Sequence, residues 1–157
     1  MFTYTAVRDE QFGIYTCAAN GEMQSFSETC IVQGPHAYDG PDFSADEQWI
    51  WFHSDRSKSF DLWRVRRDGR ELEQMSNDLR ENWFPHPAPV GDKLVYLSFE
   101  AGAAGHDQKR DVELRQFMGK GKAPKTLVSL YGGQGTLNVP SWSPDGVAFA
   151  YVEYAKD

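Results

Sequence analysis

Short apolar runs, each preceded by a proline and a polar turn, recur along the chain. Three such segments align on their prolines: PDFSADEQWIWFHSD from Pro41, PHPAPVGDKLVYLSF from Pro85 and PSWSPDGVAFAYVEY from Pro140. The alignment places Ile50, Leu94 and Phe149 at one equivalent position. The run from Trp49 to Phe52 is apolar at consecutive positions, which predicts a core strand that is buried on both faces.

A second repeated element ends in a turn that contains glycine. It begins at Phe12 (FGIYTCAANGE), Phe60 (FDLWRVRRDGRE) and Val112 (VELRQFMGKGK). The corresponding turns are Asn20-Gly21, Asp68-Gly69 and Lys120-Gly121. Asn-Gly and Asp-Gly favour tight hairpin turns that need positive φ. A short strand with a polar end follows each turn, so each unit is predicted to contain four antiparallel strands.

The repeated unit has the length and strand content of a propeller blade. Its strands are predicted at roughly 39–44, 48–55, 60–67 and 71–76 for the second unit. Four strands repeated every ~40–50 residues are typical of a β-propeller. The fold class is therefore predicted as all-β, a propeller fragment of about three to four four-stranded antiparallel blades. One partial domain, 1–157, would hold blades at about 1–29 (incomplete), 38–76, 82–130 and 137–157 (incomplete).

The predicted blades do not close a ring. The first unit lacks an innermost strand and the last one has only its first two strands, whereas closed propellers have ~4–8 blades. An open arc exposes apolar faces and unpaired strand edges. Two arrangements would cover them: the chain is part of a longer protein, or two copies meet head-to-tail as a homodimer that closes a ring of about six blades. The second arrangement leaves one strand in excess, which has to be displaced or left outside the ring.

These segments resemble the repeat of TolB-like propellers, a Tol-type, WD-like repeat. Its pattern is P-x-[FW]-S-P-D-G, an apolar strand, S-D-R and a strand that ends in D-G; PDFSADEQWIWFHSDR and PSWSPDGVAFAYVEY are similar to it. NWFPHPAP and YGGQGTLNVPSWSPDG resemble the C-terminal half of six-bladed TolB-like proteins. Ala45-Asp46-Glu47 and Val90-Gly91-Asp92 depart from Pro-Asp-Gly. The resemblance implies the C-terminal half of such a propeller, and because its relatives include enzymes and binding proteins, it leaves the function open.

Composition and charge limit the classes of partner and the cellular compartments that are expected for this chain. The formal net charge of −7 argues against nucleic acid or an anionic membrane as a partner. No apolar run is long enough to span a bilayer, which predicts no membrane insertion. The start MFTYTAVRDE lacks the features of a secretory signal, which favours the cytoplasm, or the periplasm if the sequence is a piece of an exported protein. Cys17 and Cys30 are either two thiols or one bridge, and the sequence leaves their redox state open.

Propeller geometry places candidate binding residues on one face. The loops that enter an innermost strand (CIVQGPHAYDG, NDLREN, YGGQGTLN) and those that join second and third strands (RDEQ, RSKS, EAGAAGHDQKRD) open on the same side of the central channel. Long loops on a rigid scaffold often carry binding specificity, although EAGAAGHDQKRD is equally consistent with a disordered excursion. The predicted ligand-binding residues on this channel face are Asp39, Asp42, Asn82, Trp83, His86, Gln134 and Asn138.

The favoured function is a binding or scaffold module for a peptide, protein or saccharide, with no cofactor and no catalytic residues. The alternative is part of a metal-dependent propeller enzyme, because the resemblance extends to oligogalacturonate lyases, in which histidines and a glutamine hold a divalent ion. In this chain His36, His86 and His106 would be the ligands, with Gln134 as a further candidate, since imidazole suits transition metals. The sequence contains no G-x-S-x-G motif, and GGQG lacks the Lys-Ser/Thr of a phosphate loop.

Overall fold

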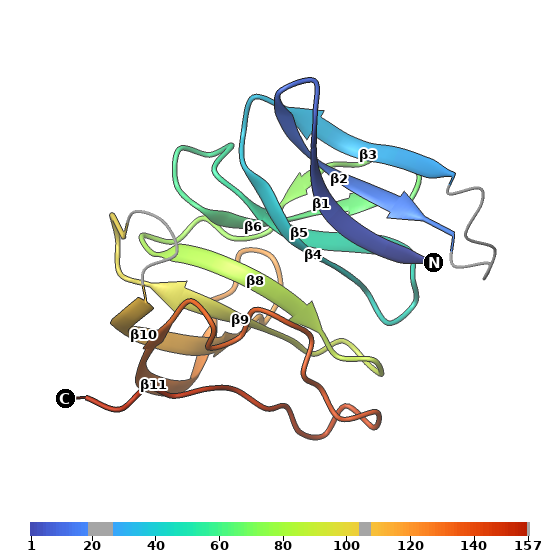
Figure 1. Ribbon diagram of the computed structural model, residues 1–157. Coiled ribbons are helices and arrows are strands. Elements are labelled where there is room, and N and C mark those ends of the chain that lie inside the picture. Colours follow the sequence, from blue (N-terminus) through green and yellow to red (C-terminus); the bar gives the residue numbers. More distant parts are fainter. Residues whose placement is uncertain (19–26, 104–107, 157) are drawn as a thin grey trace.

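The computed structural model describes residues 1–18, 27–103 and 108–156, which form three antiparallel sheets and contain no helix (Figure 1). The first sheet has the order β1 (Phe2–Arg8), β2 (Gln11–Cys17), β3 (Glu28–Gly34). The second has the order β4 (Tyr38–Phe43), β5 (Trp49–Ser54), β6 (Asp61–Arg66), β7 (Glu73–Gln74). The third has the order β8 (Glu81–Pro87), β9 (Leu94–Phe99), β10 (Gln108–Gln116), β11 (Lys125–Gly133).

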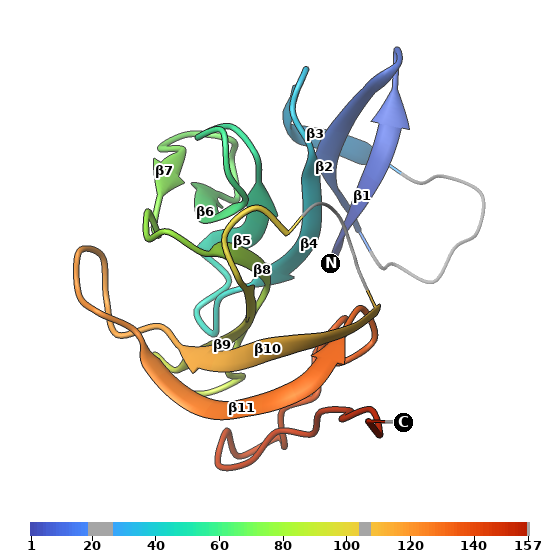
Figure 2. The ribbon, with the colours of Figure 1, turned by 90° about the vertical axis from the view of Figure 1, so that its left-hand side faces the viewer.

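The three sheets are stacked as an open arc, and the predicted fold class is confirmed. β4 and β8 are the innermost strands of their sheets and contact each other. β8 also contacts β5 and β6, and β4 contacts β1 and β2 in the same way. β1 and β2 therefore take the second-strand and third-strand positions, so the first sheet lacks an innermost strand. Figure 2 shows the sheets arranged around β4 and β8, with the C-terminal segment beyond β11.

Aromatic and branched side chains fill the spaces between successive sheets. Ile50 and Phe52 are fully buried and Trp51 is buried, so the prediction that this strand is core is confirmed there. Trp49 differs, because it lies at the partly exposed rim of the cluster that contains Trp51 and Leu94. The core thus consists of three side-chain clusters between sheets, as expected when flat elements stack face to face.

The observed strands follow the predicted pattern most closely in the second unit, where β4 to β7 begin and end within two residues of the predicted ranges. In the first unit the predicted loop CIVQGPHAYDG begins inside β3, which runs to Gly34. The turn Asn20-Gly21 and most of the strand predicted after it lie outside the described residues. Cys17 is buried and Cys30 is exposed, and no bond joins them.

The last unit is where the strand prediction is wrong. Of the two strands expected there, the described residues form only one bridge, between Trp142 and Phe149. The predicted loop YGGQGTLN also begins as strand, since β11 extends to Gly133. Among the described residues no third strand pairs with the C-terminal hairpin, and an isolated two-stranded hairpin is marginally stable. No helix in the described ranges has the length and apolar character needed to cross a membrane.

Two equivalent turns share one hydrogen-bond pattern. In the turn after β4, Ser44 Oγ donates to Asp46 Oδ1 at 2.6 Å and accepts from Trp49 N at 3.0 Å. In the C-terminal hairpin, Ser143 Oγ donates to Asp145 Oδ1 at 2.5 Å and accepts from the amide of residue 148 at 3.0 Å. These serine hydrogen bonds hold the pKa of each aspartate below its usual range. Residues 45–47 therefore form the same turn as the Pro-Asp-Gly motif, although their sequence departs from it.

Glycine at position 47 is expected to stabilise the protein. Glu47 has φ +55°, and its equivalent, Gly146, has φ +65°. A side chain in this left-handed region costs about 1 kcal/mol, which Glu47→Gly removes. The expected gain in unfolding free energy is about 0.5–1 kcal/mol, measured by urea denaturation. Ala45→Gly, in the same turn but without positive φ, is the control and should lose stability. Equal losses in both variants would contradict the expectation.

Candidate functional site

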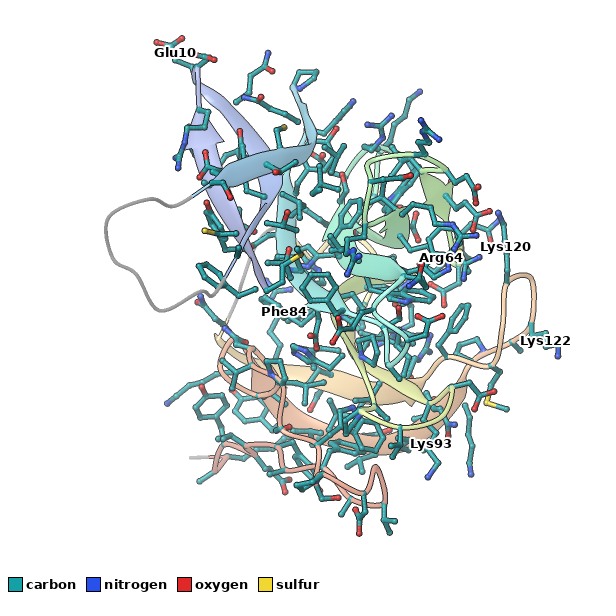
Figure 3. The ribbon with its side chains drawn as sticks, turned by 90° about the vertical axis from the view of Figure 1, so that its right-hand side faces the viewer. Glu10, Arg64, Phe84, Lys93, Lys120 and Lys122 are labelled. Atoms are coloured by element: carbon teal, nitrogen blue, oxygen red, sulfur yellow. The ribbon has the colours of Figure 1, made fainter. Side chains whose placement is uncertain are left out.

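The innermost strands β4 and β8 carry matching irregularities. The register of β4 against β5 shifts between Asp39 and Asp42, and that of β8 against β9 shifts between Trp83 and His86. Each shift contains a positive-φ residue followed by proline, with Phe84 at φ +51°. The Phe84 side chain is labelled in Figure 3. A bulge bends the strand and re-aims the next side chain. The residues after the two prolines, Asp42 and His86, therefore occupy equivalent places on the channel wall.

These two predicted residues are brought together. His86 Nδ1 lies 3.2 Å from Asp42 Oδ2, and His86 Nε2 lies 3.0 Å from the carbonyl oxygen of Leu137. Only 3% of His86 is exposed, whereas 20% of the Asp42 side chain is. A neutral imidazole has one N–H and donates to one of these oxygens at a time. The imidazole links β4, β8 and the segment that follows β11, so its contacts hold consecutive innermost segments together.

The remaining predicted polar residues on the channel side also bind protein groups. Asp39 Oδ1 accepts from Thr5 Oγ1 at 2.9 Å, which joins β1 to β4. The carbonyl of Gln134 accepts from Tyr154 Oη at 2.7 Å. Asn138 Oδ1 accepts from the amide of residue 135 at 2.9 Å. Each of these contacts fixes a strand or a turn.

Asn82 belongs to a buried network at the start of β8. Its Nδ2 donates to Asp78 Oδ1 at 3.0 Å and to Ser76 Oγ at 3.3 Å, and its Oδ1 accepts from Ser98 Oγ at 2.8 Å. No part of Asn82 is exposed. The Asn82 side chain therefore connects β8 to β9 and to the loop between β7 and β8.

Asp61 is the acceptor at the other end of this network. Its carboxylate accepts from Ser76 Oγ at 2.7 Å, Ser57 Oγ at 2.6 Å and Gln74 Nε2 at 3.0 Å. Burial raises the pKa of Asp61, and the hydrogen bonds from these side chains oppose that rise. The carboxylate therefore ties β6 to β7 and to the loop before β6.

Trp83 is a packing residue. Its ring lies 3.9 Å from that of Phe60 and 4.5 Å from that of His53, measured between centroids, and 2% of it is exposed. His53 Nδ1 accepts a hydrogen bond of 3.2 Å from the amide of Phe84. This contact supports the bulge of β8 from the neighbouring sheet.

The two described members of the predicted metal-ligand set, His36 and His86, have different neighbours. His36 Nδ1 lies 3.5 Å from Asp55 Oδ1, and the ring of Tyr38 is its neighbour at 6.5 Å. His106 lies outside the described residues. Within the described ranges no three His, Cys, Asp or Glu side chains are grouped so as to hold a metal ion. The metal site stays a prediction.

A groove of about 870 Å³ lies between the second and third sheets. It opens where the turns after β4, β8 and β10 meet. Because neighbouring strands are antiparallel, this end is opposite the loops that the sequence indicated as the binding face. The side chains that give the groove its character are Trp49, Trp51, Arg64, Val90, Phe117 and Met118. The candidate binding surface is therefore on the face that the sequence analysis did not select.

A cross-strand ladder builds one wall of the groove. The guanidinium carbon of Arg64 lies 3.9 Å from the centroid of the Trp49 ring, and that of Arg66 lies 4.1 Å from it. Arg64 is paired with Glu73 at 2.6 Å and Arg66 with Glu71 at 3.1 Å. Cation–π contacts and ion pairs together hold the two arginines in place. The sequence analysis missed this wall, and the alternation of Arg64 and Arg66 along β6 is the signal that could have indicated it.

Apolar and basic side chains form the other wall and the rim. The Phe117 ring lies 5.3 Å from the Trp51 ring in an edge-to-face arrangement. Val90 and Met118 are 50% and 43% exposed, so both offer apolar surface to a ligand. Figure 3 shows Lys93, Lys120 and Lys122 on the same side of the molecule as Arg64. Asp46 and Asp92 also line the groove, so its rim carries charges of both signs.

Comparison with known proteins finds relatives that are about twice as long as this chain. No protein-family model matches the sequence. The chain is 43% identical over 153 residues to the uncharacterized protein Atu1656 of Agrobacterium fabrum, a match that covers 98% of this chain and 51% of that protein. A solved structure described as a "putative TolB" from Agrobacterium tumefaciens superposes with a TM-score of 0.90 and 43% identity, covering 99% of this chain and 55% of that one. The chain has a TolB-like fold and spans about half the length of these relatives.

Proposed function

We propose that this chain is a TolB-like propeller module that binds a segment of a partner protein in the groove between its second and third sheets. The observation that carries the proposal is the groove itself, about 870 Å³ in volume and lined by partly exposed apolar side chains and by Arg64, which Glu73 and Trp49 hold in place. Ligand sites are typically concave and mostly apolar, with a few positioned polar groups. One wall comes from strands β5 and β6, and the other comes from the turns after β8 and β10.

The chemistry of the groove favours a peptide with apolar side chains and an acidic flank. Phe117, Met118 and Val90 offer apolar contact area; Lys93 in the lining carries positive charge, and so do Lys120 and Lys122 on the same turn as Met118. Electrostatic complementarity of this kind selects partners and speeds their association. A saccharide fits less well because the two guanidinium groups over Trp49 already occupy the ring on which a sugar would stack.

A peptide library displayed on phage tests the proposal. Twelve-residue random peptides selected against the wild-type chain should be enriched in sequences that combine an aromatic or branched apolar residue with Asp or Glu. Synthetic forms of the enriched peptides are then titrated calorimetrically against wild type and Phe117→Ser. The variant should bind at least tenfold more weakly, since about 1–3 kcal/mol of apolar contact is lost.

Leu79→Asp is the matched control, because Leu79 is 90% exposed and lies on a turn away from the groove. It should bind the peptides as the wild type does. Circular dichroism of all three proteins shows whether Phe117→Ser still folds, and Met118→Asp replaces it if it does not. No enrichment over background, or equal affinity for wild type and both groove variants, would overturn the groove as the binding site.

A further inference from the structure

Arg64 carries hydrogen-bond donors that the fold does not use. Its Nε donates to Glu73 Oε2 at 2.7 Å, and its Nη2 lies 2.6 Å from the same oxygen. Glu73 therefore occupies the edge of the planar guanidinium that Nε and Nη2 form. A guanidinium has five N–H donors, so a second edge remains, made by Nη1 and the other N–H of Nη2. Among the described residues, no oxygen accepts a hydrogen bond from Nη1.

The side chain that carries this second edge is held in place. The guanidinium carbon of Arg64 lies 3.9 Å from the centroid of the Trp49 ring and 5.7 Å from that of the Trp51 ring. Trp51 is the residue directly opposite Arg64 in the pairing of β5 with β6. The ion pair with Glu73 and the two ring contacts together restrict the rotamers of Arg64. A ligand therefore meets a preorganised guanidinium, and little conformational entropy is lost on binding.

Arg66 has similar contacts but lies outside the groove. Its guanidinium carbon is 4.1 Å from the centroid of the Trp49 ring, and its Nε pairs with Glu71 Oε2 at 3.1 Å. Arg64 lines the groove, whereas Arg66 does not. The two arginines share a charge, an aromatic neighbour and a glutamate partner, so Arg66 is a matched control for a role of Arg64 in binding.

A segment that fills the groove would cover the second edge of Arg64. Trp51, Phe117 and Met118 line the same groove, and a ligand packed on them would exclude water from the guanidinium. A charged donor that loses its water without gaining an acceptor is strongly unfavourable. The ligand must therefore supply an acceptor. A carboxylate fits best, because its two oxygens match two parallel N–H groups and charge-assisted hydrogen bonds are stronger than neutral ones.

The groove does not supply this carboxylate itself. Asp46 and Asp92 are the acidic residues in its lining, and neither is paired with Arg64. The Oδ1 atom of Asp46 already accepts from Ser44 Oγ at 2.6 Å and from Gln48 N at 3.1 Å. The second edge of the guanidinium is therefore left to a ligand.

We propose that Arg64 binds the side-chain carboxylate of an Asp or Glu of the partner segment through Nη1 and Nη2, while Glu73 holds the other edge of the guanidinium. This inference rests on the proposed function and goes beyond it. It assigns the acidic residue of the ligand to a place inside the groove, instead of to the lysines of the rim, and it makes Arg64 the residue that determines specificity.

The position of Arg64 favours a side-chain carboxylate over a terminal one. The lining of the groove extends from the turn after β4 to the turn after β10. Arg64 contacts Trp49, which follows the first turn, and Trp51, whose ring lies 5.3 Å from that of Phe117 beside the second turn. A segment that spans the groove therefore passes Arg64 with residues on both sides, and its acidic group at this point is a side chain.

Peptide selection against variants is the first test. Twelve-residue random peptides displayed on phage, with their C-termini fused to the coat protein, are selected separately against wild type, Arg64→Gln and Arg66→Gln. Wild type and Arg66→Gln should both enrich an apolar motif with Asp or Glu at a constant distance from it. Arg64→Gln should enrich the apolar motif but lose the acidic residue at that position, because its amide cannot form a charge-assisted pair.

The possible results separate this inference from the proposed function. A wild-type motif without an acidic position, or the same acidic position in peptides selected by Arg64→Gln, overturns the inference and leaves the groove as a binding site. No enrichment by any of the three proteins overturns the proposed function and the inference with it. Circular dichroism shows whether Arg64→Gln folds, and Arg64→Met, whose unbranched side chain can still lie over the two Trp rings, replaces it if it does not.

Calorimetry tests the contact itself. The most enriched wild-type peptide is synthesised with its acidic residue and with Gln in its place. Arg64→Gln should bind the acidic peptide at least tenfold more weakly than wild type does, and the Gln peptide no more than twofold more weakly. Arg66→Gln should bind both peptides as wild type does. Glu73→Gln should bind the acidic peptide no more weakly than wild type, since it removes a neighbouring negative charge.

A purely structural role of Arg64 predicts different affinities. If Arg64 only held β6 and β7 together through Glu73, Glu73→Gln would weaken binding as Arg64→Gln does, and both peptides would be affected alike. Equal losses for the acidic peptide and its Gln form, or equal effects of Arg64→Gln and Arg66→Gln, would therefore overturn the proposed contact.

Discussion

Gly40→Ala is expected to lower the free energy of unfolding by about 2–5 kcal/mol. An alanine Cβ at this position would lie 2.9 Å from Phe84 Cδ1 and 3.1 Å from His53 Nδ1. Neither ring can move freely, because both are buried and His53 accepts the amide hydrogen of Phe84. Residue 40 also has φ +61°, where a side chain is strained regardless of space. The expected loss of stability therefore has two causes, a steric clash with the two rings and the strain of a side chain at positive φ.

Gly91→Ala separates these two contributions. Gly91 has a similar φ of +77°, but a Cβ there would meet no atom within 4 Å. Its substitution should cost only the backbone term, about 1–2 kcal/mol. Urea denaturation followed by tryptophan fluorescence measures both variants against wild type. Equal losses would show that the close approach of the two innermost strands contributes nothing to stability.

Asp61→Ala is expected to destabilise the protein by about 3 kcal/mol or more. The substitution removes the acceptor of four side-chain donors: Ser57, Ser59, Gln74 and Ser76. Asp61 is 1% exposed, so water cannot fully replace the lost acceptor. Ser76 Oγ also accepts the amide of Leu62, and its displacement would loosen the pairing of β6 with β7.

Asp111→Ala is the matched control. Asp111 pairs with Lys156 at 2.7 Å, but its side chain is 74% exposed, and surface ion pairs contribute about 0–1 kcal/mol. Asp61→Asn, which keeps one acceptor oxygen, should lie between the two. Thermal unfolding by calorimetry at neutral pH ranks the three variants by their loss of stability. A loss for Asp61→Ala no larger than that for Asp111→Ala would mean that the network does not stabilise the outer strands.

Local sequence patterns were sufficient for the strands and for their grouping into sheets. The buried run that contains Ile50 and Phe52 identified a central strand, and the Asp68-Gly69 turn identified the hairpin beyond it. Both signals depend on neighbours along the chain, which is why β4 to β7 were predicted to within two residues. The same patterns overestimated the C-terminal unit, because a hairpin of two strands is marginally stable and no third strand pairs with it among the described residues.

Only the tertiary structure decided where the candidate site residues lie. The bulges of β4 and β8 turn Asp42 and His86 toward each other, and no local motif predicts positive φ at Phe84, because that backbone geometry depends on packing against His53. The groove forms from turns of two sheets that are distant in the sequence. The sequence by itself thus determined an open all-β arc, since strand and turn preferences are local. The placement of polar groups and surfaces required contacts between sheets.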